Sequence, residues 1–185
     1  MPGWLWVVIV VAALIIIGVV VASALRARRS RELQGRFGPE YDRVAADAPS
    51  KRQAEAELKA RAERHDEFDL RPLDPADRDK YRARWQDVQA KFVDDPDGAV
   101  QDADGLIQDV MRQRGYPVDD FDTRASDLSV DHPDVVENYR AGHAIAVARE
   151  RGKAGTDELR RAIQHYRSLF DALVEQTGRV EAPSA

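Results

Sequence analysis

The pattern of apolar and polar positions divides the chain into two parts. Residues 4–25 form an unbroken uncharged run, WLWVVIVVAALIIIGVVVASAL, whereas the remainder places apolar residues at helical spacing among charged ones. At about 1.5 Å of helical rise per residue the run is roughly 33 Å long, which is enough to cross a hydrocarbon core of about 30 Å. We therefore expect a transmembrane anchor within residues 1–31, followed by helices.

The same run allows a second interpretation, a cleavable signal peptide, because Ala22-Ser23-Ala24 fits a small-x-small cleavage site. Three features oppose it. No Lys or Arg precedes the run, the run exceeds the roughly 7 to 15 apolar residues of a signal core, and the basic residues follow it. We therefore favour an uncleaved anchor and keep cleavage as the alternative.

The residues that flank the apolar run predict how it lies in a membrane. Trp4 and Trp6 are near its first end, and indole rings favour the boundary between lipid and water. Its other end is Leu25, which is followed closely by four basic residues: Arg26, Arg28, Arg29 and Arg31. Because arginines beside a span are retained on the cytoplasmic side, we expect a single-pass protein with a cytoplasmic C-terminal domain.

Residues 32–70 are expected to form a charged helical connector. Gly35 and Gly38-Pro39 predict an end to the helix that leaves the bilayer, and Pro49-Ser50 predicts a second break. Residues 51–66 then form a charged helix with a narrow apolar side: Ala54, Leu58 and Ala62. We interpret this helix as a solvated strut weakly attached to any core, with a partner-binding arm as the alternative.

Residues 71–178 carry the signals of a compact helical domain. Asp74-Pro75 and Asp95-Pro96 each predict a helix start, because the Asp accepts from a first-turn N–H and Pro has no N–H to leave unbonded. The first helix places four large side chains on one face: Tyr81, Trp85, Val88 and Phe92. The second ends at Gly115, so the two are expected to form a hairpin.

The rest of the domain is predicted to contain a connector and two further long helices. Residues 116–131 are rich in acids and turn formers, with room for one short helix. Asp131-His132-Pro133 is expected to begin the next helix, and Thr156 to cap the last one. The prediction is an all-α fold of about four core helices, ending in a disordered tail at residues 179–185.

Composition narrows the classes of partner. The chain has 28 Lys and Arg against 33 Asp and Glu; four of the basic residues and none of the acids lie in residues 1–31, so the remainder has a formal charge of −9. An acidic domain is a poor partner for nucleic acid, whose phosphates are bound mostly by Lys and Arg. The absence of Cys excludes disulfides, thiolate metal ligands and Cys nucleophiles.

Sequence motifs that carry chemistry are missing. The chain has no Walker A loop, no GxGxxG after a strand, no GxSxG elbow, no HExxH and no EF-hand loop. Two of the four histidines, His65 and His132, lie in polar surroundings and are interpreted as surface residues. No catalytic residue, metal ligand set or cofactor is predicted.

One candidate pocket remains. His143 and His165 lie at equal distances from a turn near Ala154, so an antiparallel pair of helices would place them in one layer, close to Tyr139 and Tyr166. Imidazole and phenol groups in one layer would suit a metal site or an acid–base pair. A hydrogen-bonded core is the alternative interpretation of the same four residues.

The chain resembles a family of bacterial single-pass membrane-anchored proteins of unknown function. The resemblance covers nearly the whole chain, including the anchor, and it is carried by six strings: RFGPEYDR (36–43), RPL (71–73), FVDDP (92–96), RGYPVDDF (114–121), LSVDHPDVVENYR (128–140) and LRRAIQHYRSLF (159–170). It implies a bacterial cell membrane as the setting, and it brings no activity and no site residues. Some members of the family look like secreted proteins at their N-termini.

These patterns favour a membrane-tethered helical protein that binds another protein as a non-enzymatic scaffold or adaptor. The missing catalytic motifs and the charged helical domain support this expectation. An enzyme or small-ligand sensor, with its pocket near Tyr139, His143, His165 and Tyr166, is the alternative. A cavity beside those residues would favour the alternative, since ligand sites are usually concave and partly apolar.

Overall fold

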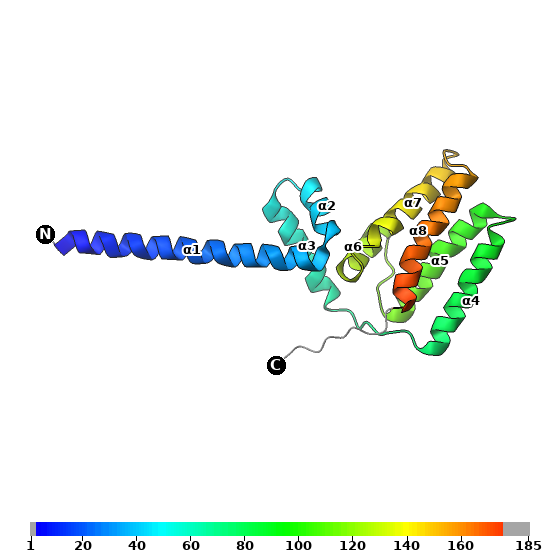
Figure 1. The fold of residues 1–185 in the computed structure, drawn as a ribbon, viewed down its shortest axis with the longest axis horizontal. Helices are drawn as coiled ribbons and strands as arrows, with labels where there is room; N and C mark the ends of the chain where they lie inside the picture. The colour runs from blue at the N-terminus through cyan, green and yellow to red at the C-terminus, as the bar shows by residue number, and fades with distance from the viewer. Residues whose placement is uncertain (1–2, 176–185) are drawn as a thin grey trace. The chain divides into compact units, whose positions relative to one another are not determined.

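The computed structural model describes residues 3–175, without the side chains at positions 5–9 and 13. The predicted tail at 179–185 and residues 176–178 of the predicted domain lie outside the described residues. Every regular element within 3–175 is an α-helix, which confirms the all-α prediction (Figure 1). The chain divides into two compact units, Met1–Lys59 and Ala60–Ala185.

The first unit contains α1 (Gly3–Phe37), α2 (Pro39–Asp47) and the first part of α3 (Lys51–His65). α1 continues through Gly35, where the sequence predicted a break, because glycine lowers the stability of a helix without ending it. The helix ends before Gly38, whose φ of 46° lies in the left-handed region that favours glycine. Pro39 then begins α2, as its missing N–H allows.

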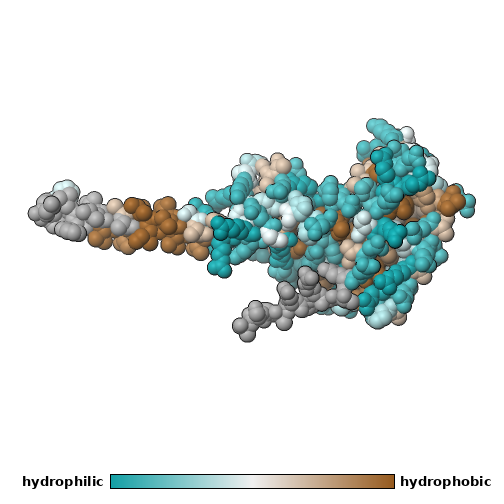
Figure 2. All heavy atoms as spheres, in the orientation of Figure 1, coloured by the Kyte–Doolittle hydropathy of each residue, from teal (hydrophilic) through white to brown (hydrophobic). Residues whose placement is uncertain are grey.

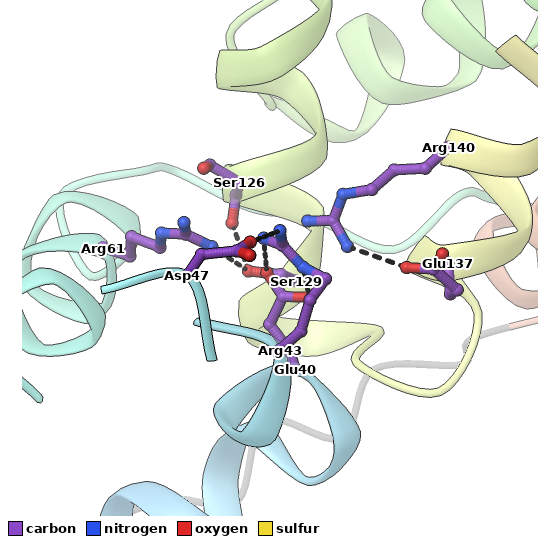
Figure 3. A network of polar contacts seen from close by, with 8 residues as sticks. All are labelled: Glu40, Arg43, Asp47, Arg61, Ser126, Ser129, Glu137 and Arg140. Carbon is purple, nitrogen blue, oxygen red and sulfur yellow. Dashed lines mark hydrogen bonds and ion pairs between the residues drawn. The ribbon is translucent and has the colours of Figure 1, made fainter. Parts of the chain in front are cut away.

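Side chains of α2 are hydrogen-bonded to their neighbours in the first unit. The Tyr41 hydroxyl donates to the Glu55 carboxylate at 2.9 Å and lies 3.3 Å from the hydroxyl of Ser30. Arg43 donates to Glu40 at 2.7 Å and to Asp47 at 3.2 Å, as drawn in Figure 3. The Ser30–Tyr41–Glu55 contacts therefore connect α1, α2 and α3.

The narrow apolar side of α3 is buried. Ala54 and Leu58 are fully buried and Ala62 is 8 % exposed, although the sequence predicted a weakly attached, solvated helix. Two alanines and one leucine offer little apolar area, but small side chains also allow close approach of another helix. The charged residues of α3 occupy the remaining faces, which are mostly exposed.

The second unit is a helical bundle. It contains α4 (Pro75–Lys91), α5 (Pro96–Arg114), α6 (Phe121–Asp131), α7 (Val136–Glu150) and α8 (Thr156–Glu175). α8 packs against both α5 and α7, and α5 also packs against α4 (Figure 1). Apolar side chains from all five helices form one core cluster.

The predicted hairpin of α4 and α5 is present. The Asp74 carboxylate accepts from the N–H of Asp77 at 2.7 Å, and Asp95 caps α5 in the same way through Gly98 at 2.9 Å. α5 ends at Gly115 with a φ of 93°. The predicted stripe on α4 faces the core, where Trp85 stacks on Phe170 of α8 with ring centroids 4.8 Å apart.

The boundaries of the last helices differ from those expected. Asp131 ends α6 instead of beginning the next helix. The N–H of His132 donates to the carbonyl of Leu128 at 2.8 Å, which completes the last turn of α6. α6 is itself an 11-residue helix in the predicted connector, and Asp120 caps it. α8 begins one residue before its predicted first turn, with Thr156 inside the helix.

Candidate functional site

The described apolar side chains of α1 are exposed along the helix. Trp4 is 64 % exposed and Leu25 is 52 % exposed. Figure 2 shows the described part of this helix as a continuous hydrophobic surface that ends where hydrophilic residues begin. Among the described residues, Val10–Phe37 is long and apolar enough to cross a membrane, although a signal sequence has the same properties.

Only some of the basic residues beside the predicted anchor form ion pairs among the described residues. Arg28 forms an ion pair with Glu32 at 3.2 Å. Arg26, Arg29 and Arg31 have no ion-pair partner among the described residues. The side chain of Trp6 lies outside the described residues, so its interfacial position stays a prediction.

The tyrosines of the candidate pocket lie in the core. Tyr139 and Tyr166 are fully buried, with ring centroids 6.0 Å apart. Gly142 leaves space for the Tyr166 ring, since a Cβ at this glycine would lie 3.3 Å from the ring. Arg124 donates to the Tyr139 oxygen at 3.1 Å, and the Tyr139 hydroxyl donates to Asp104 at 3.2 Å. Burial raises the pKa of both tyrosines, so neither acts as a base near neutral pH.

The histidines of the candidate pocket have separate partners. His165 Nδ1 lies 2.9 Å from the side-chain oxygen of Asn138. The His143 ring stacks on Phe121 with centroids 3.6 Å apart. The hollows described below in the second unit are lined by other residues. The described contacts therefore do not bring the four predicted pocket residues around one cavity.

A buried polar cluster that the sequence did not predict lies where α3 meets α6. The Asp131 carboxylate is 2.7 Å from His65 Nε2 and accepts from the Tyr116 hydroxyl at 2.6 Å. Burial acts to raise the pKa of Asp131, but the hydrogen bonds from His65 and Tyr116 outweigh it and lower the pKa to about 2. Asp131 is therefore ionised near neutral pH, and His65 donates to it through Nε2.

His132 is buried beside this cluster. It is 7 % exposed, and burial, followed by the charge of Arg114, lowers its pKa to about 4. Its Nε2 has no hydrogen-bond partner among the described residues. The interpretation of His65 and His132 as surface residues is therefore wrong, because distant segments of the chain cover both rings.

The sequence holds one signal for the position of His65. Ala54, Leu58, Ala62 and His65 follow each other at steps of four, four and three, so His65 continues the buried side of α3. Because histidine is polar, it was not counted with the three apolar residues of that side. No comparable local signal marks His132, which lies in the turn after α6.

Arginines near the end of α3 bind polar groups of α6. Arg64 donates to the Asp127 carboxylate at 3.1 Å, and Asp127 is only 2 % exposed. Arg61 lies 3.5 Å from the Ser129 hydroxyl, which in turn donates to the Ser126 carbonyl at 2.6 Å (Figure 3). Because the buried carboxylate would be costly without a partner, these contacts hold α3 and α6 in register.

The surface of the bundle has shallow, charged hollows. The α4–α5 groove, of about 530 Å³, includes five charged residues: Arg84, Asp87, Lys91, Asp102 and Asp109. Of two smaller hollows of about 270 Å³, one lies mainly between α5 and α7 and the other between α8 and the end of α4. Within residues 3–175, no group of three or more His, Asp or Glu side chains is placed to hold a metal ion.

No protein-family model, curated protein or solved structure matches this chain.

Proposed function

We propose that this protein is a single-pass protein of a bacterial cell membrane and that its cytoplasmic helical domain is a non-enzymatic scaffold or adaptor for another protein. The exposed apolar side chains of α1 carry the membrane part of the proposal. A bilayer removes that surface from water, and the arginines after Leu25 favour a cytoplasmic domain. The bacterial setting rests on the sequence resemblance.

The polar groups of the second unit support binding rather than catalysis. Asp131 is bound to His65 and Tyr116 inside the bundle, and Tyr139 to Arg124 and Asp104, whereas the Tyr166 hydroxyl has no hydrogen-bond partner among the described residues. The exposed α4–α5 groove offers ion pairs at its rim, Arg84 with Asp109 and Lys91 with Asp102. Exposed pairs of this kind contribute little to stability, so a protein partner can exchange them for its own charges at low cost.

An enzyme or small-ligand sensor centred on Tyr139, His143, His165 and Tyr166 has weaker support. Ligand sites in proteins are usually hollows of several hundred cubic ångströms. The two tyrosine rings are fully buried with centroids 6.0 Å apart, and Arg124 and Asp104 already bind the hydroxyl of Tyr139.

Photo-crosslinking in intact cells tests the scaffold. Gln101 is exposed and lines both the α4–α5 groove and a neighbouring hollow, whereas Asp79 is an exposed residue of α4 outside them. A photoreactive amino acid at Gln101 is expected to give one discrete protein adduct in the membrane fraction, and the same group at Asp79 to give none. Equal adducts at both positions, or none at either with a small molecule retained by the purified protein, would contradict the scaffold.

A high-salt wash of membranes tests the tether. The full chain is expected to stay with the membranes, because salt does not weaken the burial of apolar surface. Release by salt alone, or a mature N-terminus at Leu25, would contradict the anchor.

A further inference from the structure

A large hollow in the first unit is lined mainly by basic residues. It has a volume of about 890 Å³ and lies between α1, just after its apolar part, and the start of α3. Five cations line it: Arg26, Arg29, Arg31, Lys51 and Arg52. Glu55 is the only acid among the residues that line this hollow.

Most of the positive charge of this basic hollow has no ion-pair partner among the described residues. Glu55 already accepts a hydrogen bond from Tyr41 at 2.9 Å and lies 3.7 Å from Lys51 Nζ. Arg29 and Arg52 have no ion-pair partner among the described residues, and the same holds for Arg26 and Arg31. Like charges held around one hollow repel each other, so a bound anion would stabilise this arrangement.

The position of the basic hollow along α1 matches the headgroup layer of a bilayer. Arg26 directly follows Leu25, and at about 1.5 Å per residue Arg31 lies roughly 9 Å beyond the apolar run. The headgroup layer on each side of the hydrocarbon core is roughly 5 to 8 Å thick. Arg26 and Arg29, roughly 1.5 and 6 Å beyond the run, therefore lie within the headgroup layer, and Arg31 lies at its outer edge.

We propose that the basic hollow binds the headgroup phosphate of an anionic phospholipid of the membrane that α1 spans. This inference rests on the membrane insertion proposed above. Guanidinium groups match phosphate oxygens with two parallel N–H donors, which makes arginine the favoured residue for this ligand. Residues from two helices contribute, so the site differs from a general attraction between basic residues and an anionic surface.

Native mass spectrometry of the full chain tests the proposal. The protein is placed in detergent micelles with equal amounts of phosphatidylglycerol and phosphatidylcholine, and retained lipid is counted. We expect one phosphatidylglycerol retained in preference to phosphatidylcholine. Arg29→Gln and Arg52→Gln are each expected to lower that preference about tenfold, as for loss of a charge-assisted hydrogen bond.

Arg28→Gln is the matched control. Arg28 belongs to the same basic segment and carries the same charge, but it pairs with Glu32 and does not line the hollow. Its substitution is expected to leave the lipid preference unchanged. An equal loss with Arg28→Gln, or equal retention of the two lipids by the parent protein, would refute the site.

Two further measurements separate the remaining explanations. Displacement of phosphatidylglycerol by millimolar inorganic phosphate would show that the hollow takes free phosphate, and this outcome would also overturn the proposal. Circular dichroism checks that each variant keeps the helicity of the parent. Failure of the membrane tether appears in the salt wash described above, whereas lipid retention in micelles is measured regardless of that result.

Discussion

Protonation of His132 is expected to destabilise the second unit in mild acid. The folded protein holds the pKa of this buried imidazole at about 4, whereas in the unfolded chain the pKa returns to about 6.5. The unfolded chain therefore binds more protons between pH 4 and pH 6.5. The stabilisation is complete above pH 6.5 and is lost as the pH falls toward 4.

The magnitude follows from the two pKa values. At about 1.4 kcal/mol per pH unit, the difference between 6.5 and about 4 corresponds to roughly 3 kcal/mol of unfolding free energy. Neighbouring carboxyls also contribute. Asp131, with a pKa lowered to about 2, loses its contribution as the pH falls from 3.8 toward 2, below the range of His132. Burial raises the pKa of Asp127, which acts in the opposite direction.

Replacing His132 by a residue that does not titrate separates its contribution to the pH dependence from that of the carboxyls. Urea unfolding of residues 32–185, followed by circular dichroism at pH 7, 5.5 and 4.5, gives the pH dependence of the unfolding free energy. His132→Gln is expected to flatten that dependence between pH 6.5 and 4.5, whatever its effect at pH 7. An unchanged slope in the variant would refute a buried neutral imidazole.

Other substitutions and a topology assay give further predictions. Trp85→Ala should cost about 3 to 5 kcal/mol in urea unfolding, because it removes a buried ring that stacks on Phe170, whereas Glu57→Ala should change stability by less than about 0.5 kcal/mol. An unchanged urea midpoint for Trp85→Ala would mean that the stripe on α4 is not core. Gly115→Ala should cost more than about 1 kcal/mol, since φ is 93° and a Cβ would overlap the carbonyl of Asp69; full stability would contradict this backbone geometry. Protease added to intact spheroplasts should leave the domain whole. Digestion of the domain from outside would contradict the predicted cytoplasmic side.

Local chemistry explains which parts of the fold were predictable from sequence. Asp74 and Asp95 accept from N–H groups three residues away, so a short string contains the whole interaction. The partner of His65 is Asp131, 66 residues away, and no local pattern reports such a contact. The break predicted at Gly35 was wrong because the cost of one glycine is small beside the hydrogen bonds of a long helix.

The candidate pocket also depends on contacts between distant residues, which the sequence does not report. Equal spacing from a turn predicts which residues share a layer, but it does not predict whether the layer is hollow. Gly142 contributes to the close packing here, because a Cβ at this position would lie 3.3 Å from the Tyr166 ring. A glycine opposite a tyrosine is recognisable only when the pairing of the two helices is known. The long apolar helix, by contrast, was visible in the sequence because a long apolar run needs no tertiary partner.

In the proposed membrane-spanning arrangement, the continuity of α1 through Gly35 sets the height of the α1 end above the bilayer. Twelve residues separate Leu25 from the end of the helix at Phe37, and at about 1.5 Å each they extend roughly 18 Å beyond the hydrocarbon edge. The turn at Gly38 then lies about 10 Å above the headgroup layer in a bilayer of ordinary thickness. A rigid helix also fixes direction, since each residue added or removed before Phe37 rotates the exit of the chain by about 100°. Insertion of one residue near Gly35 would therefore turn the start of α2 about the axis of α1, while insertion of a full turn would raise it and keep its direction.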